Sequence, residues 1–312
     1  MKSIGLVIPY FGRLPGNFPV WLQSCAANPS VDWLLFTDDQ TGFAYPPNVQ
    51  VQYLTFAELK GRIQDLYDFP VALSSAYKLC DFKVAYGEIF AAELANYDFW
   101  GFCDVDLVFG NLRHFLTDSL LDQYDKVLSR GHLSLFRNTV ENNARYRSRI
   151  HGRERYKEVF GNPESCAFDE WSKEGINEIY IDQGIPFYDE LIFADIYIAR
   201  YGFYPYQLLK QKGLSQNSIF LWDHGCLTRF FRFDTQLGVD EVIYVHLQKR
   251  QMEIPVQAWT AERFLVIPNR YLPYAGATEL ADLQPFFQDR IIYWGFVRLS
   301  WKHLLKKFRK WI

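Results

Sequence analysis

The first third of the chain contains three short apolar runs, and polar residues collect where each run ends. "SIGLVIPYFG" begins at Ser3, "VDWLLFTDD" at Val31 and "YDFWGFCDVD" at Tyr97. Apolar runs of this length, bounded by turn residues, are typical of buried strands. The segments between them include stretches with helical apolar spacing. This order predicts an α/β fold with a mainly parallel sheet covered by helices.

The third run carries two aspartates, Asp104 and Asp106, with one residue between them. Carboxylates are rarely buried without a partner, and placing two close together costs more free energy still. A turn at the end of the strand lets both side chains converge at the carboxyl edge of the sheet, where ligands of open parallel sheets gather. Two convergent carboxylates need a cation, and oxygen ligands favour Mg²⁺ or Mn²⁺. Substrate phosphates normally complete the coordination shell of such a metal. The alternative is that one aspartate caps the next helix and the other is solvated.

Composition and cysteine usage narrow the class of protein. The chain has 33 Lys and Arg against 36 Asp and Glu, which argues against a protein that coats nucleic acid. The five cysteines are scattered, and neither a secretory signal nor an 18-residue apolar run is present. We therefore expect a cytoplasmic protein with reduced thiols and no nucleic-acid partner.

The order of these motifs resembles the GT-A-fold, nucleotide-sugar-dependent glycosyltransferases of bacterial capsule and O-antigen synthesis. The resemblance spans Ile4 to Arg250 and is carried by "IGLVIPYFG", "LLFTDD", "YKLCDFKVAYGEIF", "YDFWGFCDVDLVFGNL", "SRGHLSLFRNT", "FDEW", "ADI" and "YVHLQKR". It implies a catalytic domain over residues 1–255. Residues 1–115 would form a Rossmann-like half that binds the donor, most commonly a UDP-hexose, and residues 116–255 would form the acceptor half.

The same resemblance implies a metal site and a donor site. Asp106 would bind Mn²⁺ or Mg²⁺ directly, and Asp104 would touch the metal or the ribose. His246, at the end of an apolar strand, would be a third ligand, although an ordinary hydrogen bond is the alternative. Lys249 and Arg250 would hold the leaving pyrophosphate. The residues expected to frame the nucleobase, ribose and diphosphate are Pro9, Tyr10, Phe11, Asp38, Asp39, Lys78, Asp81 and Lys83. The alternative for the last three is ordinary charge on a helix surface.

An inverting glycosyltransferase also needs a carboxylate base beside the acceptor hydroxyl. The candidates are Asp169 and Glu170 in "FDEW", Asp195 in "ADI", and then Asp189 and Glu190. Asp169 could instead cap a helix, and Asp195 could form a structural hydrogen bond. A retaining mechanism needs no such base.

The end of the chain, Gly295 to Ile312, alternates tryptophans and aliphatic residues with lysine and arginine. This pattern predicts an amphipathic helix on an anionic membrane surface, within a helical extension over residues 256–312; docking on the domain is the alternative. We therefore expect a metal-dependent glycosyltransferase at the inner face of the cell membrane, acting on a glycan or lipid-linked oligosaccharide for surface polysaccharide. The alternatives are a non-catalytic nucleotide-sugar- or glycan-binding protein and a metal-dependent phosphoesterase, which would ordinarily show more ligands for two metals.

Overall fold

The computed structural model describes residues 1–206, 217–233, 236–255 and 259–288, and the chain divides into two compact units. Unit 1 comprises residues 1–14, 28–105 and 116–190, and unit 2 comprises residues 15–27, 106–115 and the chain from Leu191 onwards. The predicted division into a donor half that ends at residue 115, an acceptor half that ends at residue 255 and a C-terminal extension stays a prediction. Residues 289–312, which hold the predicted membrane-surface helix, lie outside the described residues. Within the described ranges no helix is long and apolar enough to cross a membrane.

Unit 1 is built on a seven-stranded sheet. Its strands are β1 (Ile4–Tyr10), β2 (Val31–Thr37), β3 (Val49–Tyr53), β4 (Phe99–Cys103), β6 (Lys126–Arg130), β7 (Leu133–Arg137) and β8 (Phe187–Tyr188). Their order in the sheet is β3-β2-β1-β4-β7-β6-β8. β1 is parallel to both of its neighbours, and the β2–β3 and β6–β8 pairs are also parallel. Only β7 runs antiparallel to both of its neighbours in this sheet. The predicted α/β class with a mainly parallel sheet is confirmed.

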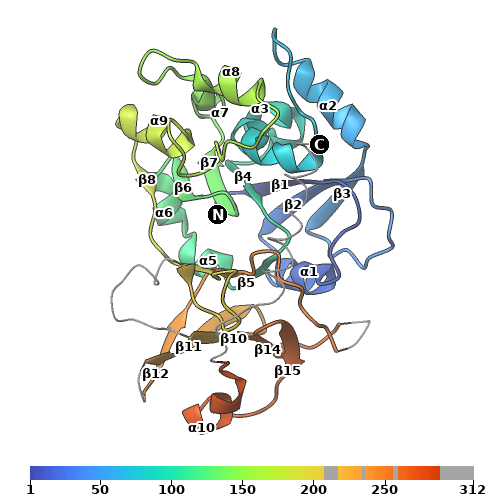
Figure 1. Cartoon of the computed structure of the whole chain (residues 1–312), viewed down its shortest axis with the longest axis vertical. Helices are drawn as coiled ribbons and strands as arrows, with labels where there is room; N and C mark the ends of the chain where they lie inside the picture. Colours follow the sequence, from blue (N-terminus) through green and yellow to red (C-terminus); the bar gives the residue numbers. More distant parts are fainter. Residues whose placement is uncertain (207–216, 234–235, 256–258, 289–312) are drawn as a thin grey trace, which may run out of the picture. The chain divides into compact units, whose positions relative to one another are not determined.

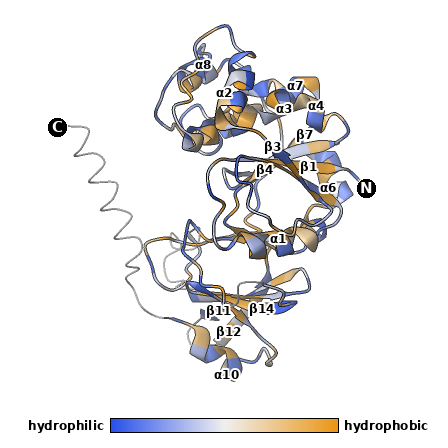
Figure 2. Cartoon of the chain, turned by 90° about the vertical axis from the view of Figure 1, so that its right-hand side faces the viewer, coloured by the Kyte–Doolittle hydropathy of each residue, from blue (hydrophilic) through white to orange (hydrophobic). Residues whose placement is uncertain are grey.

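Most helices of unit 1, but not α6, pack on one face of this sheet (Figure 1). Leu59, Phe82 and Tyr180 from three of these helices share a buried core with Val7 and Phe102 of the sheet. Figure 2 shows β1, the central parallel strand, as a hydrophobic segment, as expected for a strand buried on both faces. The helices are α2 (Phe56–Gln64), η1 (Ala76–Ala85), α3 (Tyr86–Ile89), α4 (Ala91–Leu94), α6 (Asp118–Gln123), α7 (Val140–Asn143), η2 (Arg145–Arg147), α8 (Arg155–Phe160) and α9 (Ile176–Asp182).

The stretch with helical apolar spacing that precedes the third apolar run forms three short elements within residues 76–94. It begins as the 3₁₀ helix η1 and continues as α3 and α4. A 3₁₀ helix aligns side chains that are three residues apart. This alignment puts Lys78 and Asp81 on one line, where both side chains are buried.

Unit 2 contains two further sheets. The first consists of β5 (Leu107–Phe109), β13 (Tyr244–His246) and β9 (Ala194–Asp195), with β13 in the centre. The second is antiparallel and consists of β10 (Asn217–Asp223), β11 (Cys226–Phe233), β12 (Gln236–Glu241), β14 (Arg263–Ile267) and β15 (Arg270–Pro273), in the order β12-β11-β10-β14-β15. The helices of this unit are α1 (Phe18–Ala26), α5 (Leu112–Phe115), α10 (Leu280–Leu283) and η4 (Gln284–Phe286). Val108, Phe220 and Val245 belong to one core that both sheets share.

Candidate functional site

The carboxyl ends of β1, β2 and β4 lie at one edge of the unit 1 sheet, because these three strands are adjacent and parallel. Tyr10 is in register with Thr37 at the ends of β1 and β2, so Phe11 and Asp38 follow at the same edge. The Asp38 carboxylate accepts a hydrogen bond of 2.7 Å from the backbone N–H of Gly12. Half-buried rings and an exposed carboxylate therefore come together where base and ribose contacts were predicted.

Asp39 is engaged with the loops on either side of it. Its two carboxylate oxygens accept hydrogen bonds from the backbone N–H groups of Leu14, at 2.7 Å, and Thr41, at 2.9 Å. The Thr41 hydroxyl and these N–H groups hold the pKa of Asp39 below its ordinary value. Asp39 thus shapes the rim of this edge, next to the more exposed Asp38.

Lys83 joins two of the predicted acidic residues at the end of β4. Its Nζ lies 2.7 Å from Asp104 Oδ1 and 3.7 Å from Asp169 Oδ2. It also donates a hydrogen bond of 2.7 Å to the carbonyl of Gly131. Burial alone would lower the pKa of Lys83, but the carboxylates of Asp104 and Asp169 outweigh burial and raise it.

Asp169 lies close against Gly131. Burial raises the pKa of Asp169 to about 7, against the opposing charge of Lys83. A Cβ atom at Gly131 would come within 2.6 Å of Asp169 Oδ2, so a larger residue would displace the carboxylate. Glu170 follows it as a half-buried residue. A carboxyl group with a pKa near neutrality suits proton transfer at physiological pH.

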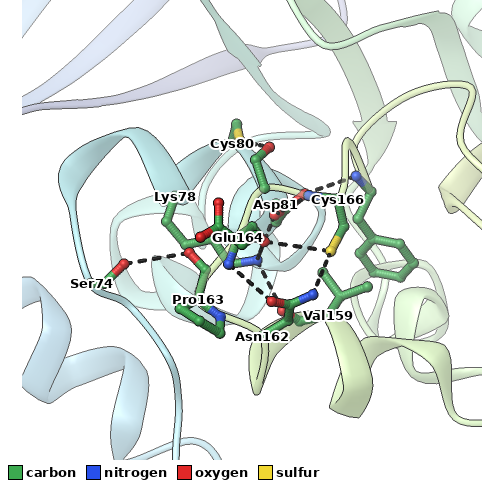
Figure 3. A network of polar contacts seen from close by, with 11 residues as sticks. Ser74, Lys78, Cys80, Asp81, Val159, Asn162, Pro163, Glu164 and Cys166 are labelled. Atoms are coloured by element: carbon green, nitrogen blue, oxygen red, sulfur yellow. Dashed lines mark hydrogen bonds and ion pairs between the residues drawn. The ribbon is translucent and has the colours of Figure 1, made fainter. Parts of the chain in front are cut away.

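Lys78 and Asp81 form a buried ion pair that fixes a loop of unit 1 (Figure 3). Lys78 Nζ donates to Asp81 Oδ2, at 2.6 Å, and to the carbonyls of Val159 and Glu164, at 3.0 and 2.8 Å. The Asp81 carboxylate also accepts from the backbone N–H groups of Cys166 and Phe168, at 2.9 Å each. Lys78 is 2 % exposed and Asp81 is fully buried. Because protein groups take up these polar atoms, we assign the pair to structure and leave it out of the proposed donor site.

Asp106, His246 and Asp195 form a chain of polar contacts in unit 2. His246 Nε2 lies 3.4 Å from Asp106 Oδ1, and His246 Nδ1 lies 2.8 Å from Asp195 Oδ1. Gln248 Nε2 donates a further hydrogen bond of 2.5 Å to the same Asp195 oxygen. Burial alone would raise the pKa of Asp106 and lower that of His246. Their mutual attraction outweighs it, lowering the pKa of Asp106 to about 2 and raising that of His246 to about 10.

The loop after His246 wraps around Asp106. The backbone N–H of Lys249 donates a hydrogen bond of 2.7 Å to Asp106 Oδ2, and the N–H of Leu247 donates one of 3.0 Å to the Asp106 carbonyl. Gln248 and Lys249 both adopt positive φ angles, of 53° and 60°, which non-glycine residues rarely do. This strained turn exposes the Lys249 side chain beside Asp106.

Arg250 has a different environment from Lys249. Its guanidinium is buried and donates to the carbonyls of Tyr197, Arg200 and Tyr201. These contacts fix the segment that follows Asp195 within unit 2. We assign Arg250 to structure, whereas the Lys249 side chain is exposed.

The sequence of residues 6–275 matches a family of unknown function, DUF6625. The chain belongs to this family. A comparison with curated proteins finds no match. Among solved structures, the DUF6625 chain is similar to the galactosyltransferase LgtC in complex with donor and acceptor sugar analogs, at 9 % identity over 61 % of this chain and 75 % of that chain, with a TM-score of 0.36. It is also similar to mouse xyloside xylosyltransferase 1 in its apo form, at 9 % identity over 80 % of this chain and 98 % of that chain, with a TM-score of 0.39.

The structure thus sorts the predicted residues of the DUF6625 chain into groups. Pro9, Tyr10, Phe11 and Asp38 share one sheet edge with Asp104, and Lys83 joins Asp104 to Asp169. Asp106, His246, Asp195 and the turn at Lys249 form a second group. Two contributors were missed: Gly131, and Gln248 as a partner of Asp195. The quoted motif "SRGH" contains Gly131, but nothing local in it indicates the approach of Asp169.

Replacing Asp81 by leucine should lower the free energy of unfolding by about 3–5 kcal/mol, because the Lys78 ammonium would stay buried without its counter-charge. The double variant Lys78→Met/Asp81→Leu should recover part of this loss. Urea denaturation gives both values. Glu154→Ala is the matched control, since Glu154 also pairs with a lysine three residues away but on the surface, and it should have little effect. A single Asp81→Leu variant as stable as the control would contradict the assignment.

Stability should depend on pH through Asp169. The folded chain keeps the Asp169 proton up to a pKa of about 7, whereas the unfolded chain releases it near 3.8. Between these values the unfolded state binds fewer protons, so this residue lowers the free energy of unfolding by about 1.4 kcal/mol per pH unit as pH rises. Denaturation of the wild type and Asp169→Asn at pH 4 to 8 measures the difference. A stability difference that does not change over this range would show that Asp169 titrates normally.

Proposed function

We propose that the chain is a divalent-metal-dependent glycosyltransferase that uses a nucleotide diphosphate sugar as donor. The observation that carries the proposal is the position of His246 between two carboxylates, with Nε2 facing Asp106 and Nδ1 facing Asp195. A histidine whose Nδ1–H is donated to a carboxylate presents its other nitrogen as a metal ligand in a fixed orientation. One carboxylate oxygen beside one imidazole nitrogen is a donor set that Mn²⁺ accepts. The residues therefore fit the metal that the sequence predicted.

Lys249 extends this centre of unit 2 towards a diphosphate. Its backbone N–H donates to Asp106 and its side chain is exposed, so we propose that the ammonium contacts the phosphates of the donor. In unit 1, Asp104 follows β4 at the edge where Phe11 and Asp38 follow β1 and β2, and we propose that this edge holds the nucleoside.

The side chains of unit 1 supply a route for the acceptor proton. In the reaction, the acceptor oxygen forms a bond to C1 of the sugar, the bond between C1 and the phosphate oxygen breaks, and the acceptor proton moves to a base. Asp169, with its pKa of about 7, and the neighbouring Glu170 are the bases we propose. When bound, the metal would neutralise charge on the departing diphosphate. Asp195 holds His246, so we propose a positioning role for it instead of the predicted role as a base.

Stabilisation by donor and metal together tests the proposal. We expect Mn²⁺ plus one member of a UDP-sugar panel to raise the melting temperature more than either does alone, and UDP to be released when a glycan acceptor is added. Asp106→Asn and His246→Ala should each weaken Mn²⁺ affinity by about tenfold or more. His224→Ala is the control, because His224 is exposed in the same unit and pairs with Asp223 and Glu262.

Three outcomes discriminate between the functions. Binding of donor and metal without UDP release would favour a non-catalytic nucleotide-sugar-binding protein. Release of phosphate from a phosphate ester without sugar transfer would favour a phosphoesterase. Mn²⁺ affinity that is equal in Asp106→Asn, His246→Ala and the control would show that the metal lies elsewhere. The more specific expectations are a UDP-hexose donor, a lipid-linked acceptor and a role in surface polysaccharide synthesis. They rest on the resemblance of the sequence to bacterial capsule and O-antigen glycosyltransferases.

A further inference from the structure

Trp171 is an exposed aromatic residue whose polar edge is already occupied. Trp171 is 43 % exposed, and its Nε1–H donates a hydrogen bond of 3.0 Å to Ser129 Oγ. The Phe187 ring packs beside it, with 6.2 Å between ring centroids. Since the only polar atom of the indole is bonded within the protein, its exposed surface is ring carbon. An exposed aromatic ring that is held in a fixed orientation can stack against the apolar face of a ligand.

Ser129 connects Trp171 to a carboxylate. The Ser129 hydroxyl donates a hydrogen bond to Asp189 Oδ1 while it accepts one from Trp171, which uses its single donor and one of its acceptor sites. The Ser129 carbonyl accepts from Asn177 Nδ2, at 2.9 Å. The hydroxyl relay therefore fixes an indole ring and a carboxylate relative to each other.

Ser129 lies in a strained bulge of β6. The register with β7 shifts between Val127 and Arg130, and Leu128 has a φ angle of 66°. Bulges re-aim side chains next to active sites, and a non-glycine residue in this conformation persists only where the surroundings hold it. Lys126 holds this one, since its Nζ donates to the Leu128 carbonyl and lies over the Phe187 ring that also contacts Trp171. Burial lowers the pKa of Lys126 to about 7.

We propose that Trp171, Ser129 and Asp189 form a subsite for a pyranose ring of the acceptor, an inference that rests on the proposed glycosyl transfer. The apolar C–H face of a pyranose matches the exposed indole carbons, and its hydroxyls donate to a carboxylate such as Asp189. The Asp189 carboxylate is itself part of the subsite and repels an anionic ligand, so the subsite suits a neutral sugar better than the diphosphate of the donor. Trp171 directly follows Asp169 and Glu170 in the chain, so an acceptor bound here would lie near the proposed bases.

Saturation-transfer NMR with methyl glucopyranoside, methyl galactopyranoside and their disaccharides tests the subsite without any donor. We expect the wild type to transfer saturation to the C–H protons of at least one of these glycosides. Trp171→Ala and Asp189→Asn should abolish the transfer, and Trp171→Phe should retain part of it. Ile181→Ala is the matched control, because it removes another exposed apolar side chain of unit 1 and should behave as the wild type.

The transfer reaction provides a second readout. With a donor found by thermal shift, Trp171→Ala should raise the acceptor KM about tenfold, as the loss of one aromatic contact predicts. The melting-temperature rise caused by donor and Mn²⁺ should persist in the same variant, which shows that it folds. Absence of saturation transfer to every glycoside in the wild type, or equal transfer in Trp171→Ala and Ile181→Ala, would overturn the subsite. Failure of the donor to stabilise the wild type would instead overturn the proposed function and leave the NMR test valid.

Discussion

His246 contacts two carboxylates at once, and main-chain pairing in the three-stranded sheet of unit 2 brings the three residues together. β13 is central, so His246 is in register with Leu107 of β5 on one side and Asp195 of β9 on the other. Asp106 directly precedes β5, and its carbonyl accepts from the N–H of Leu247. Backbone hydrogen bonds therefore fix the spacing of these side chains before any ligand binds. Such preorganisation is what a metal centre requires of its protein ligands.

In unit 1, as in unit 2, charged side chains are placed next to side chains of opposite charge. Lys83 lies between Asp104 and Asp169, and Lys78 pairs with Asp81. The two pairs differ in what they leave available. Lys78 and Asp81 are saturated by backbone groups and stabilise the fold, whereas Asp169 keeps a pKa near neutrality and Asp104 lies at the sheet edge.

The parts of the molecule that depend on local pattern could be predicted from the sequence. The apolar runs became β1, β2 and β4, and the turn after β4 carries Asp104 and Asp106. The structural role of Lys78 and Asp81 could not be predicted, because their partners lie more than 80 residues further along the chain. Likewise, the contact between Asp195 and His246 depends on a strand register across 51 residues. Periodicity indicates which face of an element is apolar, but it does not indicate which distant backbone groups will satisfy a buried charge.

The central claim is that His246 and Asp106 bind one divalent cation together. Pulsed electron paramagnetic resonance of Mn²⁺ bound to the whole chain tests it directly, because an imidazole nitrogen on Mn²⁺ produces a ¹⁴N modulation that oxygen ligands do not. We expect this modulation in the wild type and in His224→Ala, and its loss in His246→Ala. Mn²⁺ that binds the wild type with no ¹⁴N modulation, or a modulation that persists in His246→Ala, would contradict it.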